Sequence, residues 1–153
     1  MGKRQQRTLG AIVRIDLGNG YFAFAQILDK ANFAFFDLKT KSEDTDINLI
    51  ISRPILFIIA VYDRAVTSGR WEKIGKSTID ESLLTLPNKF IQDSHTGKFE
   101  IYNSNTGEIR PSTRDEVEGL ECAAVWEAEH VEERLRDHYD GKENIWVNRL
   151  KLK

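Results

Sequence analysis

The chain has 153 residues, the usual size of one domain, and a domain of this length buries roughly 70% of the surface that it exposes when unfolded. With 41% hydrophobic and 30% charged residues, its composition is globular and excludes intrinsic disorder. The net charge of -2 gives no overall electrostatic reason to bind a polyanion, and the single cysteine, Cys122, excludes an internal disulfide and argues against a thiolate metal site.

Alternating apolar residues near the N-terminus predict a β-hairpin. One apolar face runs from Val13 to Leu17 and a second from Phe22 to Leu28, with Gly18-Asn19-Gly20 between them. Asn-Gly suits a type I′ turn, because both central residues of that turn have positive φ. The apolar run Phe33 to Leu38 then extends the hairpin to a meander of three strands.

The next elements predict more strands. After the polar stretch Lys39 to Asp46, which predicts a solvated loop, Ile55 to Tyr62 is almost continuously apolar and β-branched. Such a run is typical of a strand covered on both faces, so we place it in the middle of the sheet. Trp71 and Ile74 follow, and the stretch up to Ile91 is irregular.

A second hairpin and helices close the chain. Lys98 to Tyr102 alternates, and Asn105-Thr106-Gly107 turns it towards Glu108 to Arg110. Thr113 and Glu116 have the spacing of a helical capping box. We interpret Ala123 to Trp126 as a strand.

The last strongly periodic segment is helical. Glu127 to Tyr139 places Val131, Leu135 and Tyr139 on one stripe, and Gly141 ends it. Together the elements predict an α+β fold with an antiparallel, strongly twisted or barrel-like sheet, an N-terminal hairpin meander and one or two C-terminal helices. We expect one domain over residues 1–153, with flexible tails at 1–8 and 148–153.

The N-terminal residues carry no pattern of an export signal. Met1 to Arg7 is basic, but Arg14 and Asp16 interrupt the first hydrophobic stretch. The most apolar run, Ile47 to Tyr62, is broken at 52–54 and falls short of the roughly 18 uninterrupted apolar residues of a membrane span. We therefore expect a cytoplasmic protein without membrane contact.

No motif predicts catalysis, a metal or a cofactor. His130 and His138 are eight residues apart, about 12 Å along a helix, whereas two zinc ligands on one helix face need i, i+4 spacing. No nucleophile elbow or P-loop is present, and Gly18-Asn19-Gly20 precedes a strand rather than a phosphate-binding helix. We expect a protein that is not an enzyme; a hydrolase using His95 or His138 is the alternative.

Residues 113–143 are strongly acidic, with eleven acids against four bases and a local charge of about -7. One interpretation is a solvated helix face with i, i+4 pairs such as Glu132 and Arg136. The other is an acidic docking surface for a basic partner, where charge raises the association rate. The residues predicted to contact the partner are Glu127, Glu129, Glu132, Glu133, Asp137 and Asp140.

The strand aromatics and the basic termini favour a different function, a single-stranded nucleic-acid-binding module. Yet most of the aromatics between Tyr21 and Phe36 fall on alternating faces that a domain of this size needs for its core. We therefore expect no direct contact with nucleic acid and keep this module as the alternative.

Several weak motifs occur in a recognisable order: Ile12-Val13-x-Ile15-x-Leu17-Gly18-Asn19-Gly20-Tyr21, then Phe35-Phe36-Asp37, Pro54-Ile55-Leu56-Phe57 and Trp71-x-x-Ile74-Gly75. This order resembles the immunity protein 26 family of bacterial polymorphic toxin systems. The resemblance continues through Glu121 to Trp126 and the helix that follows.

The resemblance implies an intracellular antidote that occludes a toxin domain delivered by neighbouring cells, including by contact-dependent growth inhibition. Such a toxin is often a nuclease, and a basic nuclease surface that grips phosphates would attract an acidic helix. The family supplies no catalytic residues. The oligomeric state is not indicated.

Overall fold

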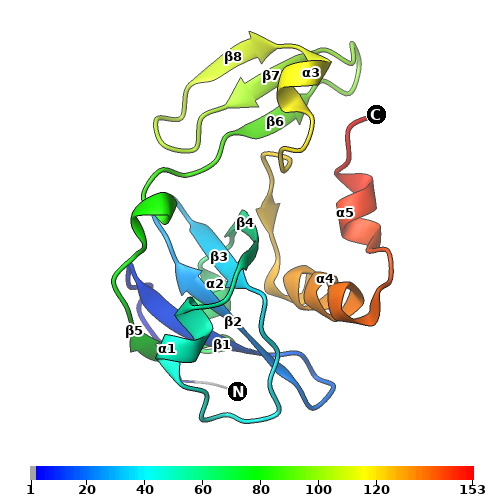
Figure 1. Cartoon of the computed structure of the whole chain (residues 1–153). Helices are drawn as coiled ribbons and strands as arrows, with labels where there is room; N and C mark the ends of the chain where they lie inside the picture. Colours follow the sequence, from blue (N-terminus) through cyan, green and yellow to red (C-terminus); the bar gives the residue numbers. More distant parts are fainter. Residues whose placement is uncertain (1–2) are drawn as a thin grey trace.

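The computed structural model describes residues 3–153 and shows a mixed α+β architecture (Figure 1). In this part of the chain, nine strands form one six-stranded and one three-stranded sheet, accompanied by five helices and one 3-10 turn. The predicted α+β class, N-terminal meander and C-terminal helices are confirmed. The six-stranded sheet is open rather than closed into a barrel.

The six-stranded sheet has the order β5-β1-β2-β3-β4-β9. Its strands are β1 (Ala11–Asp16), β2 (Phe22–Ile27), β3 (Asn32–Phe36), β4 (Ile55–Val61), β5 (Glu72–Lys76) and β9 (Val125–Trp126). All neighbours are antiparallel except β4 and β9, which pair in parallel through Ala60 with Val125 and Val61 with Trp126. The placement of β4 in the middle was wrong, because the two-residue strand β9 adds only one short neighbour beyond it.

The first hairpin is confirmed, but its type I′ turn was wrong. Asn19 does not have a positive φ, whereas Gly18 does, at 79°. The loop is longer than a two-residue turn, and the Leu17 amide donates to the Tyr21 carbonyl at 3.0 Å. Side chains close this loop: Asp16 accepts from the Gly18 amide at 2.8 Å and Asn19 from the Tyr21 amide at 3.2 Å.

The β2–β3 connection contains an unusual pair of residues. Lys30 and Ala31 have φ of 53° and 65°, in the left-handed region that residues with a Cβ rarely adopt. The Asn32 amide donates to the Asp29 carbonyl at 3.0 Å and closes the turn around them. The tight turn with two positive φ angles therefore occurs here, without a glycine.

The three-stranded sheet consists of β6 (Lys89–Gln92), β7 (Phe99–Tyr102) and β8 (Ile109–Ser112). The predicted second hairpin is β7–β8, and β6 is an additional strand within the stretch expected to be irregular. Thr113 caps the short helix α3 (Arg114–Val117) by accepting from the Glu116 amide at 3.4 Å, as its spacing predicts.

Helices cover the six-stranded sheet on both faces (Figure 1). The remaining helical elements are α1 (Ile47–Ile51), α2 (Arg64–Thr67), η1 (Glu81–Leu83), α4 (Ala128–Asp140) and α5 (Ile145–Arg149). On one face, the fully buried Phe33, Phe35 and Trp71 pack with Val131 and Leu135 of α4.

On the other face, Phe24 and Phe36 of the sheet pack with Ile50 of α1. The structure therefore has a central sheet with α2 and α4 on one side and α1 on the other.

Both termini make contacts in the described part of the chain. The Gln5 side chain donates to two backbone carbonyls, at 2.9 and 2.8 Å, and the Lys153 amide donates to a glutamine side chain at 2.8 Å. Residues 1 and 2 of the predicted N-terminal tail lie outside the described residues. That 1–8 and 148–153 are flexible, and that residues 1–153 act as one domain, remain predictions.

Candidate functional site

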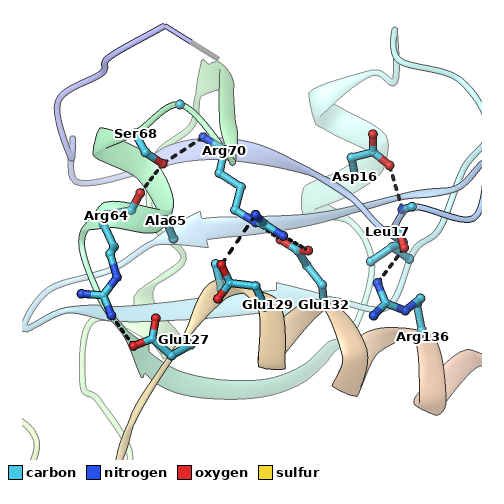
Figure 2. A pocket seen from close by; sticks show the side chains of 13 residues that line it. Asp16, Leu17, Arg64, Ala65, Ser68, Arg70, Glu127, Glu129, Glu132 and Arg136 are labelled. Carbon is cyan, nitrogen blue, oxygen red and sulfur yellow. Dashed lines mark hydrogen bonds and ion pairs between the residues drawn. The ribbon is translucent and has the colours of Figure 1, made fainter. Parts of the chain in front are cut away.

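A charged pocket of about 830 Å³ lies between α2, the turn after β1 and the start of α4 (Figure 2). Its charged lining residues are Asp16, Arg64, Arg70, Glu127, Glu129, Glu132 and Arg136. Three of the six acidic residues predicted to contact a partner thus meet here, opposite arginines that come from the segment after β4.

Glu132 lies at the inner side of this pocket, with a side chain only 7% exposed. Its carboxylate accepts hydrogen bonds from Arg70 Nε at 2.7 Å, Arg70 Nη2 at 2.8 Å and Trp71 Nε1 at 2.9 Å. The hydrogen bond with Glu132 raises the pKa of the Arg70 guanidinium, because it favours the charged form. Glu132 therefore holds α4 to the core, and both of its oxygens already accept hydrogen bonds within the chain.

Glu127 and Glu129 are more accessible. Glu127 forms an ion pair with Arg64, and Glu129, which is 60% exposed, lies 3.6 Å from the Arg70 guanidinium. Exposed pairs of this kind contribute about 0–1 kcal/mol, since water screens them. A partner's cation can therefore replace the internal one at small cost.

The other three predicted contact residues lie elsewhere on α4. Glu133 accepts from Trp146 Nε1 at 2.6 Å, and Asp137 accepts from Asn144 Nδ2 at 2.9 Å, so both face α5 and its cap. Asp140 is exposed at the end of the helix. The six acids consequently do not form one continuous surface.

The i, i+4 pair predicted between Glu132 and Arg136 was wrong. Glu132 pairs with Arg70, which lies 62 residues earlier, and Arg136 Nη1 donates to the Leu17 carbonyl at 2.8 Å. The reason is burial: Glu132 faces the core, where the indole of Trp71 and the guanidinium of Arg70 offer stronger hydrogen bonds than a solvated neighbour does.

A further acid of the 113–143 stretch is also neutralised internally. Glu121 accepts from Arg134 Nη1 at 3.1 Å and Nη2 at 2.8 Å, and this guanidinium lies 3.7 Å from the centroid of the Phe57 ring. Such a planar, bidentate pair over an aromatic ring is a fixed structural contact.

The arginines of the pocket were not predicted as site residues. Arg64 begins α2 and Arg70 follows the end of this helix, and both lie about sixty residues before the acids that they pair with. The single hint in the sequence is the position of Arg70 next to Trp71, an aromatic whose ring nitrogen needs an acceptor when buried.

The histidines lie in separate surroundings. His130 stacks on Trp146 with 3.6 Å between ring centroids, His138 packs edge-on against Tyr139, and His95 lies in the exposed β6–β7 turn. Within residues 3–153, no group of three His, Cys, Asp or Glu side chains is placed to hold a metal ion.

Most of the aromatics between Tyr21 and Phe36 lie in the core, and Tyr21 and Phe22 are partly buried against it. Phe24, Phe33 and Phe35 are fully buried, so they offer no stacking surface for nucleic-acid bases. No helix in the described part of the chain has the length and apolar character needed to cross a membrane.

Comparison with protein families places the chain among the immunity proteins. The model for Immunity protein 26 matches residues 8–101, which is more than half of the chain. The chain therefore belongs to the Immunity protein 26 family, and membership implies that it binds a cognate toxin protein. Comparisons with curated proteins and with solved structures gave no match.

The family match also has a boundary that matters for the site. It ends at residue 101, in β7, so α4 and its acidic residues lie outside the matched part of the chain. The resemblance from Glu121 onwards stays a prediction. Arg64 and Arg70 of the charged pocket and strands β1 to β5 lie inside the match.

Proposed function

We propose that this chain is a cytoplasmic, non-enzymatic immunity protein that neutralises a cognate toxin by occluding its active or substrate-binding surface. The observation that carries the proposal is the match of residues 8–101 to the Immunity protein 26 family. Occlusion requires a stable scaffold and a complementary surface, and an interface of about 1,600 Å² in total is sufficient for a specific complex.

The proposed toxin is a nuclease with a basic surface. An enzyme that binds phosphates carries lysine and arginine side chains, and these are attracted to acidic groups on an inhibitor. The accessible carboxylates that support this part of the proposal are Glu127, Glu129 and Asp140. Their expected effect is mainly on the association rate, because charges at the rim of an interface steer encounter more than they add affinity.

Co-expression tests the immunity role directly. The toxin domain encoded by the gene immediately upstream is induced in cells with and without this chain, and survival is measured. We expect protection together with a complex of the two purified proteins. If the chain neither protects the cells nor binds the toxin domain, the proposal is wrong.

Charge reversal tests the acidic residues separately. In Glu129→Lys/Asp140→Lys, we expect slower association with the toxin domain and a smaller dependence of the rate on salt. Glu108→Lys, which reverses one exposed charge in the β7–β8 loop, is the control for a charge reversal away from α4. An unchanged association rate in the double variant would remove α4 from the proposed interface and leave the immunity role intact.

A further inference from the structure

A second hollow, of about 770 Å³, lies on the face of the six-stranded sheet opposite α4, between the end of α1 and η1. We call it the apolar groove. The large apolar side chains that line it are Phe36, Ile51, Ile55, Ile79, Leu83 and Leu84. Leu84 is 64% exposed and Ile51 is 39% exposed, so two large aliphatic side chains of the groove face solvent. Apolar side chains gathered at a hollow are a common mark of a binding surface.

The α1 wall of the groove exposes apolar surface because its helix is too short to bury it. Four of its five residues are aliphatic, but Ile50 alone is fully buried against the sheet. Asp46 caps the first turn by accepting from the Asn48 amide at 3.1 Å. Just after the helix, Arg53 Nε donates to the Asp37 carbonyl at 2.9 Å. Ile51 therefore sits on a fixed element and is not exposed through fraying.

The η1 wall is held at both of its ends. Before it, Gln26 Nε2 donates to the Ser77 carbonyl at 3.0 Å from a side chain that is almost fully buried. After it, Leu86 and Asn105 exchange two hydrogen bonds, of 2.8 and 2.9 Å. Leu84 lies between these two attachments. A partner that covers Leu84 would find the segment already ordered, which lowers the entropy lost on binding.

We propose that the apolar groove is the anchor site for the cognate toxin, and that it receives an aliphatic or aromatic side chain from a toxin segment that also carries a basic residue. This inference rests on the proposed immunity function. All the residues that line the groove lie inside the family match at 8–101, so the surface belongs to the part of the chain that implies toxin binding.

The charge of the rim specifies the neighbouring residue of the toxin. Asp80 and Glu81 line the groove on the η1 side, and Arg53 is the single base that lines it. Because two carboxylates face one guanidinium, the rim has a net negative charge and favours a cation on the partner. A basic toxin surface with one protruding apolar side chain fits both features.

Two charge insertions test the groove. The probe is the purified toxin domain encoded by the gene immediately upstream, titrated against full-length wild type, Leu84→Asp and Ile51→Asp. We expect each variant to weaken binding about thirtyfold or more, mainly through faster dissociation, as expected for a central hot-spot residue. Leu84→Met, which keeps an apolar side chain, should bind within about threefold of wild type.

The matched control is Ile109→Asp, because Ile109 is 51% exposed but lies on β8, away from the groove. If wild type binds and the two groove variants bind as tightly as Ile109→Asp, the groove proposal is overturned and the immunity function stands. If wild type itself does not bind, both proposals fail.

Hydrogen exchange on the wild-type complex provides a measurement that needs no variant. Protection of residues 51–55 and 78–84 on addition of the toxin domain supports the groove. Protection confined to α4 overturns it.

Discussion

Replacing Glu132 by alanine distinguishes a structural carboxylate from one that is available to a partner. In the folded protein this side chain accepts three hydrogen bonds, two from Arg70 and one from the ring nitrogen of Trp71. The two donors differ in their access to water: Arg70 is 45% exposed, whereas Trp71 is fully buried. Removal of the carboxylate therefore affects them differently.

The expected loss of stability follows from this difference. The Trp71 ring nitrogen is buried away from water and would have no replacement acceptor, and an unsatisfied buried donor costs about 1–3 kcal/mol. Arg70 can rehydrate, so the loss of its ion pair adds only about 0.5–1 kcal/mol after discounting for solvent screening. The sum is about 1.5–4 kcal/mol, which lowers the Tm of a domain of this size by roughly 3–16 °C.

Urea unfolding followed by tryptophan fluorescence and circular dichroism measures the free energy of unfolding of Glu132→Ala. Glu129→Ala is the control, because Glu129 contacts the same arginine from an exposed position and should cost less than about 0.5 kcal/mol. In the background Trp71→Phe, which removes the buried donor, Glu132→Ala should lose most of its effect. A loss in Glu132→Ala no larger than in Glu129→Ala would refute the reasoning.

Four other changes have definite expected outcomes. Ala31→Gly should raise the free energy of unfolding by about 0.5–1 kcal/mol, because it relieves a left-handed φ of 65°, although glycine gains entropy in the unfolded chain. Gly107→Ala should lower the free energy of unfolding by about 1 kcal/mol, because alanine is strained at a φ of 79°; no atom lies within 4 Å of the added Cβ, so a clash adds nothing. Urea unfolding should therefore give changes of opposite sign for Ala31→Gly and Gly107→Ala. Burial raises the pKa of Tyr139 to about 12, so native protein keeps a proton that the unfolded chain loses above about pH 10. This contribution to the free energy of unfolding is present below pH 10 and is lost as pH rises through about 12. In an ultraviolet titration of the tyrosines, the step at the highest pH should be absent from Tyr139→Phe. Burial lowers the pKa of Lys89, so between this lowered pKa and the ordinary value of about 10.4 the unfolded chain binds more protons than the folded protein. The free energy of unfolding should therefore rise with pH in this range, and the rise should be smaller in Lys89→Met.

The parts of the fold that were predicted correctly are those with a local, repeated pattern. The alternation on both sides of residues 18–20 predicts the first hairpin, and the stripe of Val131 and Leu135 predicts α4, because burial of one face imposes these periods. The elements that were missed are too short for a period. The five residues of α1 make little more than one turn, and α2 has four residues. The two-residue strand β9 lies within the strand predicted at Ala123 to Trp126.

The turn after β1 shows a different limit. Asn19-Gly20 has the composition of a type I′ turn, but the side chains of Asp16 and Asn19 offer acceptors to nearby amides and stabilise a longer loop. The tight turn with two positive φ angles occurs instead at Lys30-Ala31, where neither residue favours it. Tertiary contacts, among them the Lys89 side chain on Asn32, hold that conformation.

The candidate site was predicted only in part, for reasons of distance along the chain. A count of charges in residues 113–143 treats every carboxylate as free, yet Glu127 and Glu132 find their partners more than sixty residues earlier, at Arg64 and Arg70. The count also does not include how buried each carboxylate is, so a buried acid and an exposed acid contribute equally to the local charge. Pairings of this range depend on the topology that places α2 beside α4.

The two hollows would contribute differently to an interface. In the charged pocket, a partner's cation replaces an exposed ion pair that is already formed, as between Arg64 and Glu127, and because exposed pairs contribute only about 0–1 kcal/mol, the exchange adds little net affinity. In the apolar groove, Leu84 and Ile51 are exposed on ordered segments, and covering them removes apolar surface from water without breaking a contact. The acidic side chains should therefore act on the encounter rate and the groove on the lifetime of the complex, and separate measurement of the two rate constants in charge and groove variants resolves their roles.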